Sequence, residues 1–217
     1  MLKNLSLNKK LAFGFGTVII GLILVGLIAL TNINKIDVSV MDLAEVHIPL
    51  FEAITEVDVI VTSQELAITQ YAVHKEEEFI EKFHEFDVDA DAHIEKVITV
   101  LKTDQDLIDQ GWMTEADTIA ERHDLFVKSS NTLLEAIKAG AAYEEWDLLA
   151  DKVMESSAFV MESIDKFLEM NTEETEKIAS AAEIAADSAK SIITIVGILT
   201  VVIGSVLAFV IGLSITK

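Results

Sequence analysis

The sequence predicts an all-α protein in which two transmembrane helices flank an extracytoplasmic, antiparallel, up-down-up-down four-helix bundle. Three observations predict this fold. Two uncharged apolar segments lie near the two ends of the 217-residue chain. Between them, apolar side chains recur at alternating steps of four and three residues, which is the spacing of a helical seam. No run of residues alternates between apolar and polar in the manner of a β-strand.

The first apolar segment is Leu11–Leu30, and its uncharged run extends to Asn34. The second, Ser191–Thr216, carries no charge at all. A bilayer core requires about 20 apolar residues in a helix, so both segments suffice. A cleaved signal peptide is disfavoured for the first, because its apolar run is too long and no small-x-small cleavage site follows. A buried core helix is disfavoured for the second, because it is apolar on every face. We therefore predict transmembrane helices at residues 11–32 and 191–215.

Basic residues flank the predicted spans at both ends of the chain, at Lys3, Lys9, Lys10 and Lys217. The positive-inside rule then places both termini in the cytoplasm. Residues 1–10 form the cytoplasmic N-terminus, and residues 33–190 form a domain outside the plasma (inner) membrane. The lipid bilayer is thus an expected partner of the chain.

Four seams predict the four helices of the bundle. They run from Ile36 to Tyr71, from Phe79 to Val100, from Trp112 to Ile137, and from Trp146 to Met170. The connections are "HKEEE", "TDQDLIDQGW" and "KAGAAY", the last of which places Gly140 as a helix C-terminal cap. Pro49 lies inside the first helix, where it removes a hydrogen bond and is expected to produce a kink. The two tryptophans begin the third and fourth helices and are expected to pack at the helix ends.

Composition excludes several classes of function. Residues 31–190 hold all 37 acidic residues and 12 of the 16 basic ones, hence a net charge of −25. Such a surface repels nucleic acids, so no nucleic-acid partner is expected. The chain has no Cys, which excludes disulfides and thiol nucleophiles. No nucleophile–base set and no phosphate-binding Gly loop is present, so we predict no enzymatic activity, no catalytic residue and no cofactor.

Several stretches carry a family resemblance: the basic entry "LKNLSLNKKLAFGF", the Pro-containing helix "VMDLAEVHIPLFEAITEVDVIV", the helix turn in "ELAITQYAVHKEEEFIEKFHEF", and the end "GLSITK". Together they resemble the four-helix-bundle sensor half of methyl-accepting chemotaxis receptors and the related input domains of histidine kinases. The resemblance covers the whole chain. Residues 216–217 look like the start of a truncated HAMP-like cytoplasmic linker, so the resemblance implies a cytoplasmic signalling module that is missing from this chain.

The resemblance implies transmembrane signal input by a homodimer that packs through its first and fourth helices. In this family, Arg residues on those helices bind the carboxylate group of an amino-acid ligand. The present chain departs from that pattern, because its only Arg is Arg122, predicted on the third helix. The stimulus is therefore left open as an unknown small molecule or protein. The alternatives are the sensor half of a histidine kinase and a membrane scaffold that senses nothing.

Polar residues at or beside seam positions are the candidate ligand-binding residues: His47, Gln64, His93, Arg122 and His123. Helical rise places His47 ~20 Å above the membrane, with His123 roughly 7 Å higher and His93 about 15 Å higher than His47. One interpretation is a haem, metal or pH-sensing site. The favoured one is that these histidines fix the register of the helices, as buried Asn does in coiled coils.

No metal site is predicted from the sequence. "EKFH" has the Glu-x-x-His spacing of di-iron bundles, but it occurs once where two copies are needed. The acidic run "HEFDVDADAH" lacks the Gly of a calcium loop and is interpreted as a solvated helix face.

Overall fold

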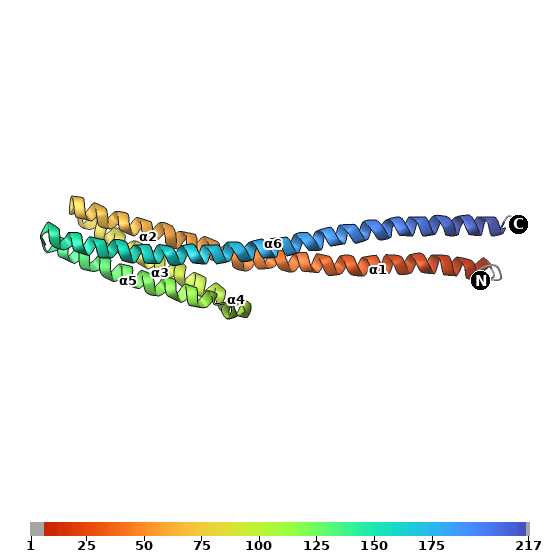
Figure 1. Ribbon diagram of the computed structural model, residues 1–217, viewed down its shortest axis with the longest axis horizontal. Helices are drawn as coiled ribbons and strands as arrows, with labels where there is room; N and C mark the ends of the chain where they lie inside the picture. Colours follow the sequence, from red (N-terminus) through yellow and green to blue (C-terminus); the bar gives the residue numbers. More distant parts are fainter. Residues whose placement is uncertain (1–6, 216–217) are drawn as a thin grey trace. The chain divides into compact units, whose positions relative to one another are not determined.

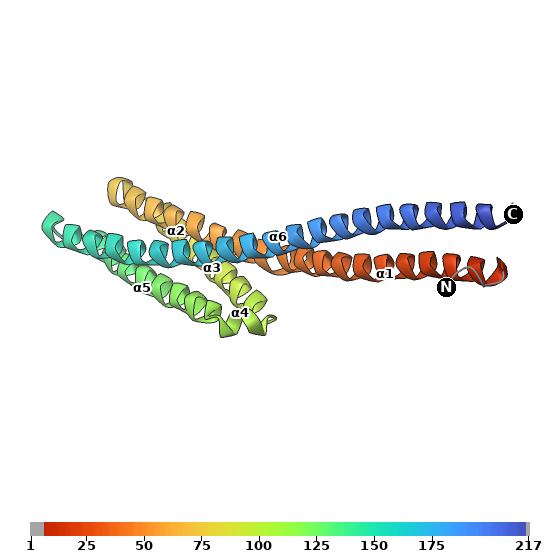
Figure 2. The same cartoon turned by 45° about the vertical axis from the view of Figure 1, so that its right-hand side comes forward.

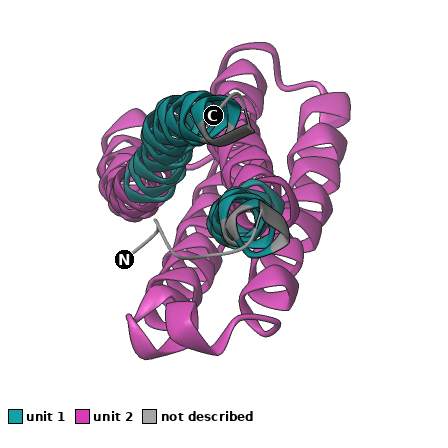
Figure 3. Ribbon diagram, turned by 90° about the vertical axis from the view of Figure 1, so that its right-hand side faces the viewer, with its two compact units in different colours: residues 1–41, 177–217 teal, residues 42–176 magenta. Residues whose placement is uncertain are grey.

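The computed structural model describes residues 7–215. Residues 1–6 of the predicted cytoplasmic N-terminus and the predicted linker residues 216–217 therefore lie outside the described residues. The chain divides into two compact units (Figure 3). One unit comprises residues 42–176, and the other comprises residues 1–41 together with 177–217.

The unit of residues 42–176 is a four-helix bundle, as predicted. Its helices are, in chain order, η2 (Leu43–His47), α2 (Ile48–His74), α3 (Glu77–Leu101), α4 (Gln105–Asp109), α5 (Trp112–Lys138) and the first part of α6 (Tyr143–Ile215). Helices α2, α3, α5 and α6 run side by side (Figures 1 and 2). The short helix α4, which was not predicted, lies in the connection between α3 and α5. No strand occurs within residues 7–215.

The predicted seams form the core of this bundle. Every seam residue from His47 to Tyr71 is buried, and so is every seam residue of α5 from Trp112 to Ile137. On α3 the seam prediction is partly wrong, because Ile94 is buried and its neighbour His93 is only half-buried. Ala90, Ile94, Val97 and Leu101 are buried, so the alternating steps of four and three are kept, but every second seam position lies one residue later than predicted.

The helix ends carry the local structures that the sequence favours. The N-cap of α4 is Asp104, whose carboxylate accepts bonds from the N–H groups of Asp106 and Leu107 at 2.9 and 3.2 Å. Helix α5 ends at Lys138 and is followed by Ala139 and by Gly140, whose φ is 76°. There the N–H of Gly140 bonds to the Ile137 carbonyl, and the N–H of Ala141 bonds to the Ala136 carbonyl. This is the Schellman arrangement, and it confirms the predicted cap.

Pro49 is accommodated by a π-helical turn. The residues Leu43–His47 form this turn, and Pro49 follows as the second residue of α2. The N–H of Ile48 bonds to the carbonyl of Leu43, five residues earlier. Because proline has no N–H and its ring collides with the carbonyl four residues before it, a regular α-helix cannot pass through this point. One wider turn absorbs the conflict and keeps the chain helical.

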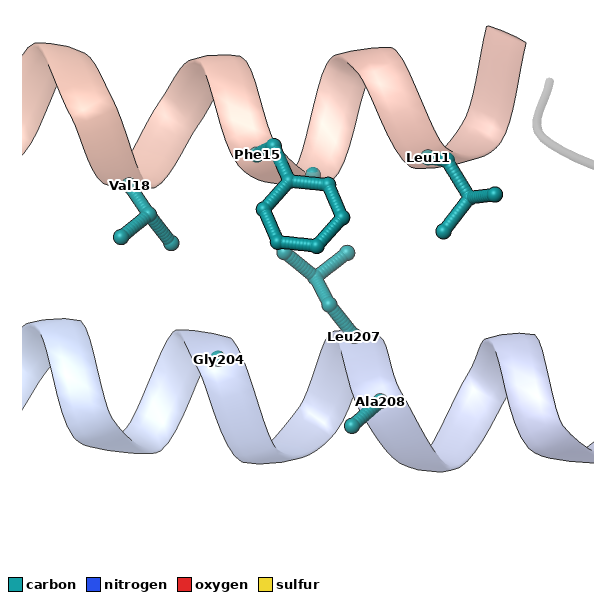
Figure 4. Close-up of a pocket in the computed structure, with 7 residues that line it drawn as sticks. Leu11, Phe15, Val18, Gly204, Leu207 and Ala208 are labelled. Carbon is teal, nitrogen blue, oxygen red and sulfur yellow. The ribbon is translucent and has the colours of Figure 1, made fainter. Parts of the chain in front are cut away.

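The other unit pairs α1 (Leu7–Asp42) with the final part of α6. Both helices are long and apolar enough to cross a membrane. Their packing is close where side chains are small, because a Cβ on Gly14 would lie 3.3 Å from Leu207. Figure 4 shows Leu207 pointing toward α1 beside Phe15, in an apolar pocket of 270 Å³ between the two helices. Small residues at such contacts are typical of helices that associate in lipid.

A substitution at Gly140 tests the cap of α5. We expect Gly140→Ala to lower the free energy of unfolding of the bundle by about 1–2 kcal/mol, because a side chain is strained at positive φ. Denaturation of the detergent-solubilised chain, followed by tryptophan fluorescence, measures the change. Ala139→Ser, at an exposed neighbouring residue with φ of −71°, is the control and should change the stability by less than about 0.5 kcal/mol. Equal stability of Gly140→Ala and the native chain would contradict the assigned cap.

Candidate functional site

The bundle core contains buried polar side chains that form two separate clusters. One cluster centres on His47 and the other on His123, whose exposed fractions are 2% and 0%. Burying a polar group costs free energy unless the group is hydrogen-bonded. In each cluster the hydrogen bond joins side chains from two different helices. Both clusters lie within residues 42–176.

The first cluster joins the π-turn to α6. His47 Nδ1 lies 2.9 Å from Asn171 Oδ1, and the Asn171 amide donates to the His47 carbonyl at 3.3 Å. The His47 ring also contacts Trp112 edge-on, with ring centroids 5.7 Å apart. Trp112 in turn packs edge-on against Phe167 at 5.3 Å. The prediction that Trp112 packs at a helix end is thus confirmed. In this cluster His47 of η2 and Trp112 of α5 both contact α6.

The second cluster joins α2, α3 and α5. His123 Nε2 lies 3.2 Å from Gln64 Oε1, and both side chains are fully buried. On the other side of the ring, Nδ1 lies 3.6 Å from Asp91 Oδ1 and has no hydrogen-bond partner. Burial lowers the pKa of His123, against the opposing effect of the nearby carboxylates. The neutral imidazole is therefore the favoured form at neutral pH.

A pair of carboxylates on α3 faces this ring. Asp87 and Asp91 are four residues apart, hence one helical turn apart on the same face of α3. One ligand atom of each carboxylate and one of His123 lie within 4.8 Å of one another. Asp87 is half-buried, and this burial raises the pKa of its carboxyl group. The three side chains converge on one point from two helices and could hold a metal ion.

The other two candidate residues lie apart from these clusters. His93 is half-buried on α3, and its Nδ1 is buried without a hydrogen-bond partner. Arg122 donates to the Phe159 carbonyl at 2.7 Å and to Glu162 at 3.0 Å. With its donors directed at α6, Arg122 lines a groove of 410 Å³ in which Lys152 and Glu155 also lie. Of the five predicted residues, the structure brings only Gln64 and His123 together.

An apolar pocket of 380 Å³ opens at the end of the bundle where α5 connects to α6. Its walls come from α2, α5 and α6 and include Ile68, Leu133, Trp146 and Met154, with Glu65 and Thr69 as polar groups. A concave apolar site with a few polar groups is the usual form of a small-molecule site. None of the five predicted ligand-binding residues lines it.

Sequence reasoning did not identify several residues of these sites. Asn171 was missed because the fourth seam was continued through Met170, whereas the buried position is the next residue. Asp87 and Asp91 were interpreted as part of a solvated face, although their four-residue spacing is a signal for a shared partner. Glu115 was also missed. It is 7% exposed and is paired with Lys166 of α6.

A family model described as a four helix bundle sensory module for signal transduction matches residues 4–185. No curated protein and no solved structure matches the chain.

A double-mutant cycle tests the contact between His47 and Asn171. We expect Asn171→Leu to lower the free energy of unfolding by about 1–3 kcal/mol, because it leaves a buried ring nitrogen without a partner. The measurement is chemical denaturation of the full chain in micelles, with the buried Trp112 as fluorescent reporter.

The matched control is the double variant His47→Leu/Asn171→Leu, which replaces both partners by apolar groups. Its loss of stability should be smaller than the sum of the two single losses by at least ~0.5 kcal/mol. Strict additivity would show that the two side chains do not interact.

Proposed function

The chain belongs to the family of four-helix-bundle sensory modules for signal transduction, and on that premise we propose that it is the input half of a chemoreceptor-type transmembrane receptor. In this proposal the bundle lies outside the plasma (inner) membrane, and both termini are cytoplasmic. An unidentified small molecule or protein acts on the bundle, and the signal passes through α6 and the second span. The role is one of binding and relay, without catalysis.

The observation that carries this proposal is the continuity of α6, which is one helix from Tyr143 to Ile215. Its first part contributes buried residues such as Val160 and Phe167 to the bundle core. Its last part contains an apolar stretch of sufficient length to cross a bilayer. An α-helix satisfies its own backbone hydrogen bonds in both water and lipid, so one element can serve in both. An unbroken helix of this kind supports the proposed relay of a signal along the chain.

Specific contacts hold α6 in one position within the bundle. They include the hydrogen bonds of Asn171 to His47 and the ion pair of Lys166 with Glu115. The Ser129 and Ser156 hydroxyl groups also bond, at 2.7 Å. If α6 packed in a second position, it would have to break these contacts and form others. The helix would therefore move between two separate positions instead of shifting gradually. A ligand selects between two such packings only through its different affinity for each.

The apolar pocket is the proposed place where a small stimulus molecule acts. Trp146 and Met154 of α6 form one of its walls, and Ile68 of α2 forms another. A ligand between these walls therefore contacts the helix that continues into the second span. The lining favours a molecule that is largely apolar, with one polar group near Glu65 or Thr69.

Exposed apolar residues on α2 support the proposed homodimer. Val59, Leu66 and Val73 follow one another at seven-residue steps, with exposed fractions of 55%, 56% and 70%. A seven-residue apolar repeat on an exposed helix face is the pattern by which helices of identical chains pair. A parallel dimer through this face would cover the stripe on both copies.

Single-cysteine labelling tests the proposed topology, and the absence of native Cys makes the labelling specific. We expect a membrane-impermeant maleimide to modify the Asp151→Cys variant in intact cells in which the reagent can reach the outer face of the plasma membrane. Lys9→Cys should react only after permeabilisation, because it lies on the cytoplasmic side. Both side chains are exposed in the native chain, and the cysteine-free chain is the control. The reverse labelling pattern would overturn the proposed orientation.

A helix break tests the relay. In a chimera of residues 1–217 with the cytoplasmic half of a chemoreceptor, we expect Asn171→Leu to shift the basal kinase-controlling output. Ala186→Pro should abolish that shift, because proline costs about 3 kcal/mol in a helix interior and interrupts α6. Ala186→Ser is the control, since it keeps the helix and should preserve the shift. An equal shift with and without Ala186→Pro would show that the signal does not pass along α6.

A further inference from the structure

One group of side chains outside the proposed relay has the form of a ligand set. Asp87 and Asp91 project from α3 toward His123 of α5, and one ligand atom of each lies within 4.8 Å of the others. We propose that these three residues bind one divalent transition-metal ion, of the class represented by Zn²⁺. The site goes beyond the sensory role, because it joins α3 to α5 and does not involve α6.

The imidazole of His123 is an unsatisfied ligand directed at the carboxylates. Its side chain is fully buried, and its Nδ1 makes no hydrogen bond. The Nε2 atom lies 3.2 Å from Gln64 Oε1, and in this orientation of the Gln64 amide Nε2 carries the proton of the neutral ring. The lone pair of Nδ1 then faces Asp91 Oδ1 across 3.6 Å. Two lone pairs that face each other repel, and a cation between them replaces the repulsion by two bonds.

Gln64 has the position of an orienting residue. Metal-binding histidines commonly donate their other ring N–H to a carbonyl or carboxylate oxygen, which fixes the tautomer and the plane of the ring. The contact of Gln64 Oε1 with His123 Nε2 supplies this oxygen from α2. Gln64 is therefore a positioning residue for the metal, and it contacts the ion only through His123.

The donor set selects the class of ion. One imidazole nitrogen and two carboxylate oxygens suit Zn²⁺ and neighbouring transition ions, whereas Mg²⁺ and Ca²⁺ favour sites made of oxygen alone. The three residues leave a fourth tetrahedral position for water. The Asp91 side chain is 66% exposed, which opens the site to solvent on one side and allows the ion to enter.

Negative charge around His123 favours a cation. The carboxylates of Asp87, Asp91 and Asp124 all interact electrostatically with this ring. The two ligands from α3 and the one from α5 would be held together by the ion. Binding should therefore stabilise the folded bundle by mass action, since the unfolded chain does not bring the ligands together.

The test uses the untagged full chain in detergent micelles, titrated with ZnCl₂ and followed by calorimetry and thermal unfolding. The key variant is Asp91→Asn, whose exposed side chain can be changed without disturbing the core. The matched control is Asp89→Asn, which removes the same charge from an exposed position of the same helix. Co²⁺ provides a second readout, because coordination by an imidazole changes its visible absorption bands.

We expect one saturable Zn²⁺ site per chain, with a rise in melting temperature, in the native protein and in Asp89→Asn. Asp91→Asn should weaken binding at least ~10-fold, and Gln64→Leu should weaken it about 10- to 100-fold. The absence of saturable Zn²⁺ binding to the native chain, or equal binding by Asp89→Asn and Asp91→Asn, would overturn the site. Equally tight binding of Mg²⁺ or Ca²⁺ would overturn the assigned class of ion.

Discussion

The architecture depends on one constraint, namely that α6 is a single helix whose two parts differ in the polarity of their side chains. From Tyr143 to Glu176 it has to present an apolar face to the other helices of the bundle and a charged face to water. From Ser191 onward it carries no charge within the described residues and is apolar enough to cross a membrane. The sequence combines both parts without a Gly-Pro break or a turn, so the backbone hydrogen bonds continue through the change. The same continuity makes the helix a candidate for relay.

Buried polar residues fix the register of α6 and of its partners more sharply than the apolar core does. Layers of leucine and valine can shift relative to one another at a moderate cost in free energy, because an apolar side chain can pack against many other apolar side chains. The bonds of Asn171 to both the ring and the carbonyl of His47 exist in one register only. A slip by one helical turn would leave two buried polar groups without partners, and each would cost about 1–3 kcal/mol. In the proposed relay, a contact of this kind would make the response to a ligand a choice between separate states.

The sequence predicted the helices well and the contacts between them less well, and the reason is physical. Periodicity along one helix defines its buried face, so the seams of α2 and α5 were correct residue by residue. The displaced seam on α3 and the missed Asn171 have one cause: both seams keep the steps of four and three, but the spacing of apolar residues did not decide the order in which these steps alternate. The π-turn before Pro49 could not be predicted from apolar spacing, because spacing does not show how the helix avoids the clash between the proline ring and the carbonyl four residues earlier. The approach of Asp87 and Asp91 to His123 depends on the relative height of two helices, which spacing within either helix does not contain.

The proposed metal site and the proposed relay meet at Gln64. Helices α3 and α5 carry the metal ligands, and neither contains an apolar stretch that could cross a membrane. An ion bound there can influence α6 through the core that the helices share and through direct contacts of α5 with α6, such as the hydrogen bonds of Arg122, the residue next to His123. Gln64 belongs to α2 and bonds to the metal-facing His123. Its neighbours along the seam of α2 are Val61 and Ile68, which belong to the same core as Val160 and Phe167 of α6. The coupling between ion and relay is then limited by the difference in metal affinity between the two packings of α6. An ion that binds both packings equally would stabilise the bundle and leave the signal unchanged, which separates a structural role of the metal from a sensory one.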